Sequence, residues 1–94
     1  MYQVKVAEDA ARFIRKQDKH IQHQIINSIR GLAQNPRPQG YKKLQGCKEL
    51  YRIRSGNYRI AYTIREKTLL VFVVRVAHRK NIYRHLEEQR NGGV

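Results

Sequence analysis

Apolar positions in the first third of the chain recur with the spacing of two amphipathic helices. Residues 1–6 alternate as a short strand, and acidic residues at Glu8 and Asp9 then open a helix, because negative charge in a first turn complements the helix dipole. Asp18 is a candidate N-cap for a second helix. Asn35-Pro36 predicts its end, because the residue before proline avoids helical geometry. This second helix buries a stripe formed by Ile21, Ile25, Ile29 and Leu32.

The second half of the chain alternates with the period of strands. We expect three strands, at about 49–54, 57–65 and 69–77, and turns at Ser55-Gly56 and Glu66-Lys67 make them consecutive antiparallel neighbours. A short final helix is expected at about 80–89. Residues 36–48 contain both prolines and several lysines, so they are expected to form an exposed basic connection.

The order of these elements predicts an α+β fold. Strand, two helices, three strands and a final helix give a two-layer sandwich, with both helices packed on one face of a mostly antiparallel sheet. The chain has 94 residues, of which 40% are hydrophobic, and this length favours one domain, residues 1–94, with one core. The opposite sheet face would then be available for function.

The charge balance points to a polyanionic partner. Twenty Lys and Arg residues against seven Asp and Glu residues give a net charge of +13, and such a field concentrates nucleic acid at the surface. A basic protein that only binds anionic surfaces without specificity is the alternative. Charge alone does not separate a binder from a nuclease.

A single cysteine, Cys47, excludes an intramolecular disulfide and a zinc site built from several cysteines. Residues 1–6 lack an apolar signal core, and the longest apolar run, Leu69 to Val74, is far shorter than the ~20 residues that span a membrane. We therefore expect a cytoplasmic protein without a membrane partner.

Three arginines are predicted to share one face of the sheet. Because side chains alternate along a strand, Arg52 and Arg54 lie on the same face, and a two-residue turn puts one of them opposite Arg59. Like charges opposite one another destabilise a sheet, so this cluster suggests a function that needs an anion such as phosphate. The alternative is a solvated face whose arginines extend into water.

A second basic cluster follows the last strand. Unbroken alternation would put His78 on the arginine face and Arg79 on the opposite face, unless the strand ends earlier. Tyr83 would either anchor the last helix or act in proton transfer or base stacking, and positive neighbours would favour its phenolate form as a general base. No metal-ligand spacing and no phosphate-binding glycine loop is present, so we expect catalysis without a metal or an organic cofactor.

Four sequence segments together resemble the RelE family of bacterial and archaeal toxins, and the resemblance extends over nearly the whole chain. The segments are Lys43-Leu44-Gln45-Gly46, Leu50-Tyr51-Arg52-Ile53-Arg54, Gly56-Asn57-Tyr58-Arg59-Ile60-Ala61-Tyr62 and Val76-Ala77-His78-Arg79-Lys80-Asn81-Ile82-Tyr83. The order of elements also matches that family.

The resemblance implies a ribosome-dependent endoribonuclease that cleaves messenger RNA in the decoding site. In that family the RNA 2'-hydroxyl attacks the adjacent phosphate, no metal or cofactor is needed, and a RelB-type antitoxin holds the toxin inactive in a hetero-oligomer. The implied partners are therefore such an antitoxin, the 70S ribosome with its RNA, and messenger RNA.

The resemblance also implies which residues form the catalytic site, because several positions of this chain match functional positions of that family. Arg52 and Arg54 match basic positions often occupied by lysine, Arg59 matches a phosphate-stabilising arginine, and Arg79 and Tyr83 match a catalytic pair. The arginine-for-lysine differences at Arg52 and Arg54 preserve phosphate binding but weaken any role in proton transfer. Further contacts to RNA or the ribosome are expected from Lys42, Lys43, Lys48 and Lys80.

The leaving 5'-oxygen needs a proton, and arginine is a poor donor, whereas histidine titrates near operating pH. His78 is therefore our candidate acid. Two alternative functions stay open: a ParE-like inhibitor of DNA gyrase, which has the same fold, and a noncatalytic RNA-binding or ribosome-associated protein.

Overall fold

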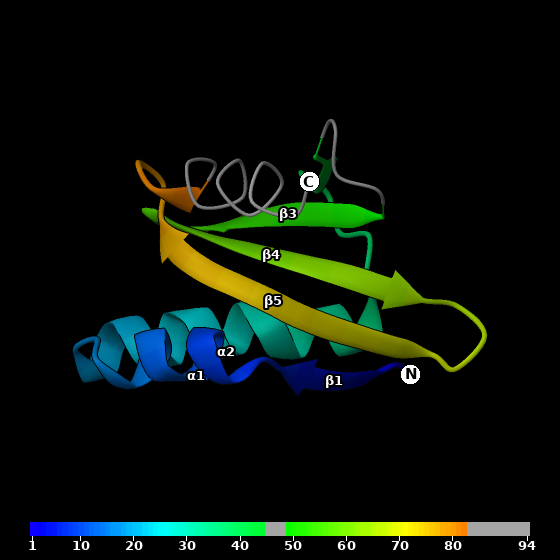
Figure 1. Cartoon of the computed structure of the whole chain (residues 1–94), viewed down its shortest axis with the longest axis horizontal. Coiled ribbons are helices and arrows are strands. Elements are labelled where there is room, and N and C mark those ends of the chain that lie inside the picture. The colour runs from blue at the N-terminus through cyan, green and yellow to red at the C-terminus, as the bar shows by residue number, and fades with distance from the viewer. Residues whose placement is uncertain (45–48, 83–94) are drawn as a thin grey trace, which may run out of the picture.

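Two helices cover one face of a twisted sheet in the computed structural model, which describes residues 1–44 and 49–82 (Figure 1). Within those residues the sheet has five strands in the order β1-β5-β4-β3-β2, where β1 is parallel to β5 and the other pairs are antiparallel. The strands are β1 (Gln3–Val6), β2 (Lys42–Lys43), β3 (Leu50–Ser55), β4 (Tyr58–Arg65) and β5 (Leu70–His78), and the helices are α1 (Glu8–Arg15) and α2 (Lys19–Gln34). The predicted α+β sandwich is confirmed.

The helices begin and end where the sequence predicts. α1 starts at Glu8 with its acidic first turn, and α2 starts after Asp18, although the Asp18 side chain makes no capping hydrogen bond. Asn35 is extended and ends α2 before Pro36. Three of the four predicted stripe residues are buried, and Ile21 is half-buried against the core.

The main core lies between the helices and the sheet. The helical side chains Ile25, Ile29 and Leu32 pack there against alternate residues of the strands. The loop after α2 is tied to this core by the buried Tyr62 hydroxyl, which donates to the Pro36 carbonyl oxygen at 2.7 Å. Burial raises the pKa of Tyr62 well above its ordinary value, so this donor stays protonated. The strand contributions to this core are Ile53, Ile60, Tyr62, Ile64, Val71, Val73 and Val76.

The turn between β3 and β4 comprises Gly56 and Asn57, one residue later than predicted. Ser55 pairs with Tyr58 across it, and Gly56 has a positive φ of 61°. A Cβ at Gly56 would also lie 2.5 Å from Gln24 Nε2, so glycine is required for both its backbone conformation and its lack of a side chain. Arg54 lies opposite Arg59, which is one of the two predicted registers, and both registers leave every side chain on the same face.

A β-bulge in β5 changes the faces of the residues that follow it. Tyr62 pairs with Val73 but Ala61 pairs with Arg75, so Val74 is the extra residue. The predicted alternation is therefore correct as far as Val73 and inverted from Arg75 onward. The short strand β2 is a further difference from prediction, because this segment was expected to be a connection. Most of the predicted final helix lies outside the described residues.

Candidate active site

The sheet face away from the helices, which we call the outer face, contains the predicted arginine cluster. Arg54 pairs directly with Arg59, and Arg52 pairs with Ala61 on the same face. The prediction that these three side chains share one face is confirmed. The outer face is defined by Gln3, Lys5, Lys42, Leu50, Arg52, Arg54, Arg59, Ala61, Thr63, Arg65, Leu70, Phe72, Arg75 and Ala77.

Arg59 is held at the end of the β3–β4 hairpin. Its Nη1 donates to the Tyr58 carbonyl oxygen at 2.9 Å and to the Gly56 carbonyl oxygen at 3.0 Å. These contacts fix the guanidinium beside the turn, next to its cross-strand neighbour Arg54. Two guanidinium groups are thus placed together at one end of the outer face, where a phosphate could bridge them.

Arg52 is buried, with only 4% of its surface exposed. Its Nε and Nη1 atoms are buried and have no hydrogen-bond partner within the described part of the chain. An unpaired buried guanidinium is costly, and a bound anion would offset that cost. Arg52 lies beside a second apolar cluster on the outer face, formed by Leu44, Leu50, Ala61, Ala77 and Ile82.

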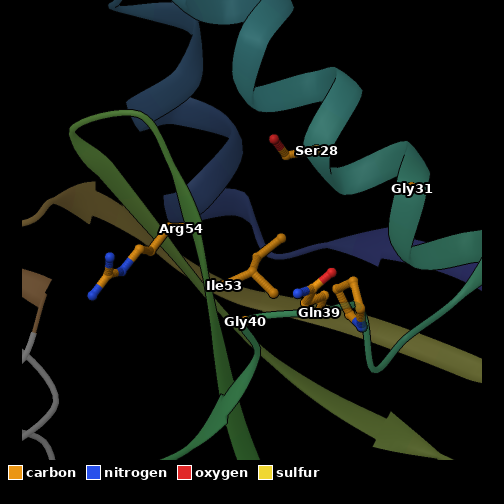
Figure 2. A pocket seen from close by; sticks show the side chains of 7 residues that line it. Ser28, Gly31, Gln39, Gly40, Ile53 and Arg54 are labelled. Carbon is orange, nitrogen blue, oxygen red and sulfur yellow. The ribbon is translucent and has the colours of Figure 1, made fainter.

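Arg54 is exposed, and Figure 2 shows its side chain pointing away from α2, whereas Ile53 on the same strand points toward it. Between β3, α2 and the following loop lies a pocket of about 320 Å³ that Ile53, Ser28 and Gly40 help to line. Arg54 also helps to line this pocket, so the pocket and the arginine cluster share this residue.

His78 does not lie on the arginine face, and the expectation that it would is wrong. It pairs with Tyr58, and their rings meet edge to face at 5.6 Å on the side of the sheet covered by the helices. Phe13 of α1 packs against the same tyrosine. The bulge at Val74 is the cause, because it inverts the alternation before the end of β5.

The histidine also has a defined hydrogen bond. His78 Nδ1 accepts from the Lys80 backbone N–H at 3.3 Å, which favours the neutral tautomer with its proton on Nε2.

Arg79 is brought to the same end of the sheet as the arginine cluster. Its backbone N–H donates to the Asn57 carbonyl oxygen at 2.8 Å, which joins the segment after β5 to the β3–β4 turn. Its side chain and that of Lys80 are exposed. Lys42 pairs with Arg52 at the edge of the outer face, whereas Lys43 pairs with Tyr51 on the other face.

The predicted site residues Tyr83 and Lys48 lie outside the described residues. In the ranges 1–44 and 49–82, no group of three or more His, Cys, Asp and Glu side chains is placed to hold a metal ion. None of the helices described is long and apolar enough to cross a membrane.

Sequence reasoning missed Arg75, which pairs with Ala61 on the outer face. Strict alternation from Val71 and Val73 would have put this arginine into the core and Val76 outside it. A buried arginine without a partner is costly, so that conflict was the available signal for a bulge.

Comparison with known proteins places the chain among small toxins. Residues 4–83 match the sequence model of a family described as the ParE toxin of the type II toxin-antitoxin system parDE. A RelE-like toxin protein of Escherichia coli is 36% identical over 81 residues, which cover 84% of each chain.

Two solved structures show the same architecture. The toxin in the intact E. coli RelBE toxin-antitoxin complex is 28% identical, with a TM-score of 0.71, over 83% of this chain and 96% of that one. The isolated E. coli RelE toxin is 25% identical, with a TM-score of 0.71, over 95% of this chain and 98% of that one.

Proposed function

The chain belongs to the RelE/ParE family of toxins from type II toxin-antitoxin systems, and from that membership we propose that it is a ribosome-dependent endoribonuclease that cleaves messenger RNA in the decoding site. The observation that carries this proposal is the arginine cluster. Arg54 and Arg59 face each other, and the adjacent Arg52 has buried guanidinium nitrogens without partners among the described residues. A buried guanidinium such as that of Arg52, unpaired within the described residues, is unfavourable until an anion binds.

In the proposed reaction the RNA 2'-hydroxyl loses its proton to a base and attacks the adjacent phosphorus. The P–O bond to the 5'-oxygen breaks, leaving a 2',3'-cyclic phosphate and, after protonation, a free 5'-hydroxyl. Arg59 and Arg52 stabilise the charge that develops on the phosphorane, and each well-placed donor contributes on the order of 10²–10³ in rate. The resemblance supports Arg79 and Tyr83 as a catalytic pair, and we assign the role of the base to Tyr83.

The position of His78 is relevant to the last step, in which the leaving 5'-oxygen receives a proton. His78 stays a prediction for this role, but it lies on the helix-covered side of the sheet and accepts a hydrogen bond at Nδ1. To act as an acid it would have to turn to the outer side of the sheet end. Loss of cleavage in His78→Ala, with retention in Arg79→Lys, would support it, and unchanged single-turnover cleavage in His78→Ala would exclude it.

The test is cleavage of messenger RNA by the purified protein with and without programmed ribosomes, mapped by primer extension. We expect cuts at decoding-site codons only when ribosomes are present. Arg59→Gln and Tyr83→Phe should lower the single-turnover rate by about 10²-fold or more while the protein still binds ribosomes. Lys19→Gln, which removes an exposed charge at the start of α2, is the matched control and should cleave normally. Ribosome binding without cleavage by the wild type would identify a noncatalytic RNA-binding protein instead.

A second candidate function is inhibition of DNA gyrase. The observation that favours it is the family match itself, which is described as the ParE toxin. A supercoiling assay with purified gyrase separates the two: inhibition without ribosomal cleavage selects the ParE-like function, and cleavage without inhibition selects the nuclease.

We also propose an acidic antitoxin as the partner, because the solved relatives include toxin-antitoxin complexes. A groove of about 280 Å³ between β1, α1 and α2 fits an apolar segment of such a partner. Arg30, which also lines it and forms no ion pair within the described residues, matches an acidic chain in charge. The apolar lining consists of Val6, Ala11, Ile14, Ile26 and Ile29.

A further inference from the structure

The outer face extends well beyond the arginine cluster and exposes an aromatic ring there. Phe72 of β5 is 37% exposed and pairs with Lys5 of β1 on one side and Thr63 of β4 on the other. Thr63 follows Arg59 by four residues on the same strand, a separation of about 13 Å at the usual rise of a strand. Phe72 therefore lies on the same surface as the reacting site but clear of it.

One cation, Lys5, pairs with Phe72, and a second, Arg75, lies three residues further along β5. The five described strands contain no Asp or Glu residue. The ion pairs among the described residues involve Arg12, Arg15 and Arg37, which belong to the helices and the loop after them. Lys5 and Arg75 form none within that part of the chain, so their charges are available to a polyanion.

The bulge in β5 contributes to this surface. By adding Val74 it turns Arg75 outward beside Ala61 and lets Val76 fill the core. Bulges commonly redirect side chains near functional sites. Here the redirected arginine lies between the Arg59 end of the face and Phe72.

We propose that Lys5, Phe72 and Arg75 form a docking subsite for the single-stranded RNA adjoining the reacting phosphate. Phe72 stacks on a base, and Lys5 and Arg75 contact backbone phosphates. Exposed aromatic rings among cations on a sheet bind single strands in this way, without sequence preference, because every base has a stacking face. The inference deepens the proposed function and rests on it for the identity of the ligand.

Binding to RNA can be measured apart from cleavage. A fluorescent single-stranded RNA with 2'-O-methyl groups lacks the nucleophile, so anisotropy titration of the full-length protein reports affinity alone. Phe72→Ala should weaken binding by about five- to a hundred-fold, the range for loss of one stacked base. Phe72→Tyr should bind within about twofold of the wild type. Lys5→Gln and Arg75→Gln should weaken binding and each reduce the slope of log K against log salt by about one.

Matched controls come from the β4–β5 turn. Leu69→Ala removes an apolar side chain that is 48% exposed, and Lys67→Gln removes an exposed charge, both away from the paired strands. Both should leave RNA affinity unchanged apart from the small effect of net charge. Melting temperatures of all variants show whether a loss of binding reflects unfolding, and Lys5→Gln, at an exposed residue of β1, retains the test if Phe72→Ala does not fold.

The outcomes separate this inference from the proposed function. If the wild type cleaves on ribosomes but the Phe72 and Lys5 variants match it in RNA affinity and in cleavage, the docking subsite is overturned and the nuclease stands. If the wild type fails to cleave but RNA affinity depends on Phe72 as predicted, the subsite stands and the nuclease fails. If Phe72→Ala binds RNA normally and instead loses an acidic protein partner, the face is a protein interface and the inference is overturned.

Discussion

Arg52 combines a structural cost with a proposed catalytic benefit. Its guanidinium is 4% exposed and has two nitrogens without hydrogen-bond partners in the described structure, next to an apolar cluster. Replacement of an unpaired buried charge by an apolar side chain of similar length is often neutral or stabilising. The residue is thus better explained by an anionic ligand than by the fold alone.

This reasoning predicts opposite effects of Arg52→Met on stability and on activity. Urea unfolding should show equal or greater stability, because the buried charge and its desolvation cost are gone. Single-turnover cleavage on ribosomes should fall by about 10²-fold, because one donor to the phosphorane is lost. Arg30→Met, at an exposed arginine of α2 on the helical side of the sheet, is the control and should change neither property much. A marked loss of stability in Arg52→Met would show that the arginine serves the fold.

At the level of single elements, the β3–β4 hairpin depends on Gly56. The residue combines φ of +61° with close approach to the Gln24 side chain, whose Nε2 donates to the Ser55 carbonyl oxygen at 2.8 Å. This turn places Arg54 opposite Arg59. It also anchors the backbone N–H of Arg79, which donates to the Asn57 carbonyl oxygen. The geometry of the candidate site therefore rests on one glycine.

Gly56→Ala should destabilise the protein by about 1–2 kcal/mol, because the left-handed backbone and the contact with Gln24 both disfavour a Cβ. Urea unfolding measures this. A double-mutant cycle with Gln24→Ala separates the two causes, because removal of the Gln24 side chain should relieve the contact and leave only the backbone cost. Gly40→Ala is the matched control: φ is also positive there, at 90°, but nothing lies within 4 Å of an added Cβ. Equal effects at Gly40 and Gly56 would mean that the Gln24 contact is unimportant.

The elements also show which parts of the site could be predicted from sequence. Arg52, Arg54 and Arg59 were placed correctly because alternation has a period of two, so the two predicted registers, which differ by two residues, put the same side chains on this face. His78 was misplaced and Arg75 missed because a bulge adds one residue. The bulge lets Val76 rather than Arg75 enter the core. Whether a bulge forms depends on how the core packs, and the local sequence pattern alone does not determine that.

At the scale of the whole molecule, Glu66 links distant parts of the chain. It accepts a hydrogen bond from the Tyr2 hydroxyl at 2.7 Å and pairs with Arg37, so it joins the N-terminus, the β4–β5 turn and the loop after α2. The hydrogen bonds from Tyr2 and then Arg37 lower the pKa of Glu66 below its ordinary value. A carboxyl whose pKa is lower in the folded state contributes stability above its unfolded pKa and loses it as pH falls through its folded pKa.

Glu66→Gln should therefore lower the melting temperature slightly at pH 7 and have a smaller effect at pH 3. The effect is small because both partners are exposed and solvent screens the pair. Thermal unfolding followed across this pH range measures it. Asp9→Asn, which removes a carboxylate paired with Arg12 within one helix, is the comparison. An equal difference between wild type and Glu66→Gln at both pH values would contradict the assigned ionisation.

The placement of the apolar groove predicts that antitoxin binding and catalysis can be separated by mutation. The groove lies between β1, α1 and α2, whereas the arginines lie on the opposite face of the sheet. Ile26→Glu puts a negative charge into the apolar lining, where it opposes an acidic partner, and should weaken binding of the cognate antitoxin by about 30-fold or more. Cleavage by the free protein should be unchanged, because no outer-face residue is altered.

Asn27→Glu is the matched control, because this substitution at an exposed neighbour on α2 adds the same negative charge outside the groove. Equal antitoxin affinity of the two variants, measured by calorimetry, would exclude the groove as the docking site and leave the outer face as the surface that an acidic antitoxin must cover.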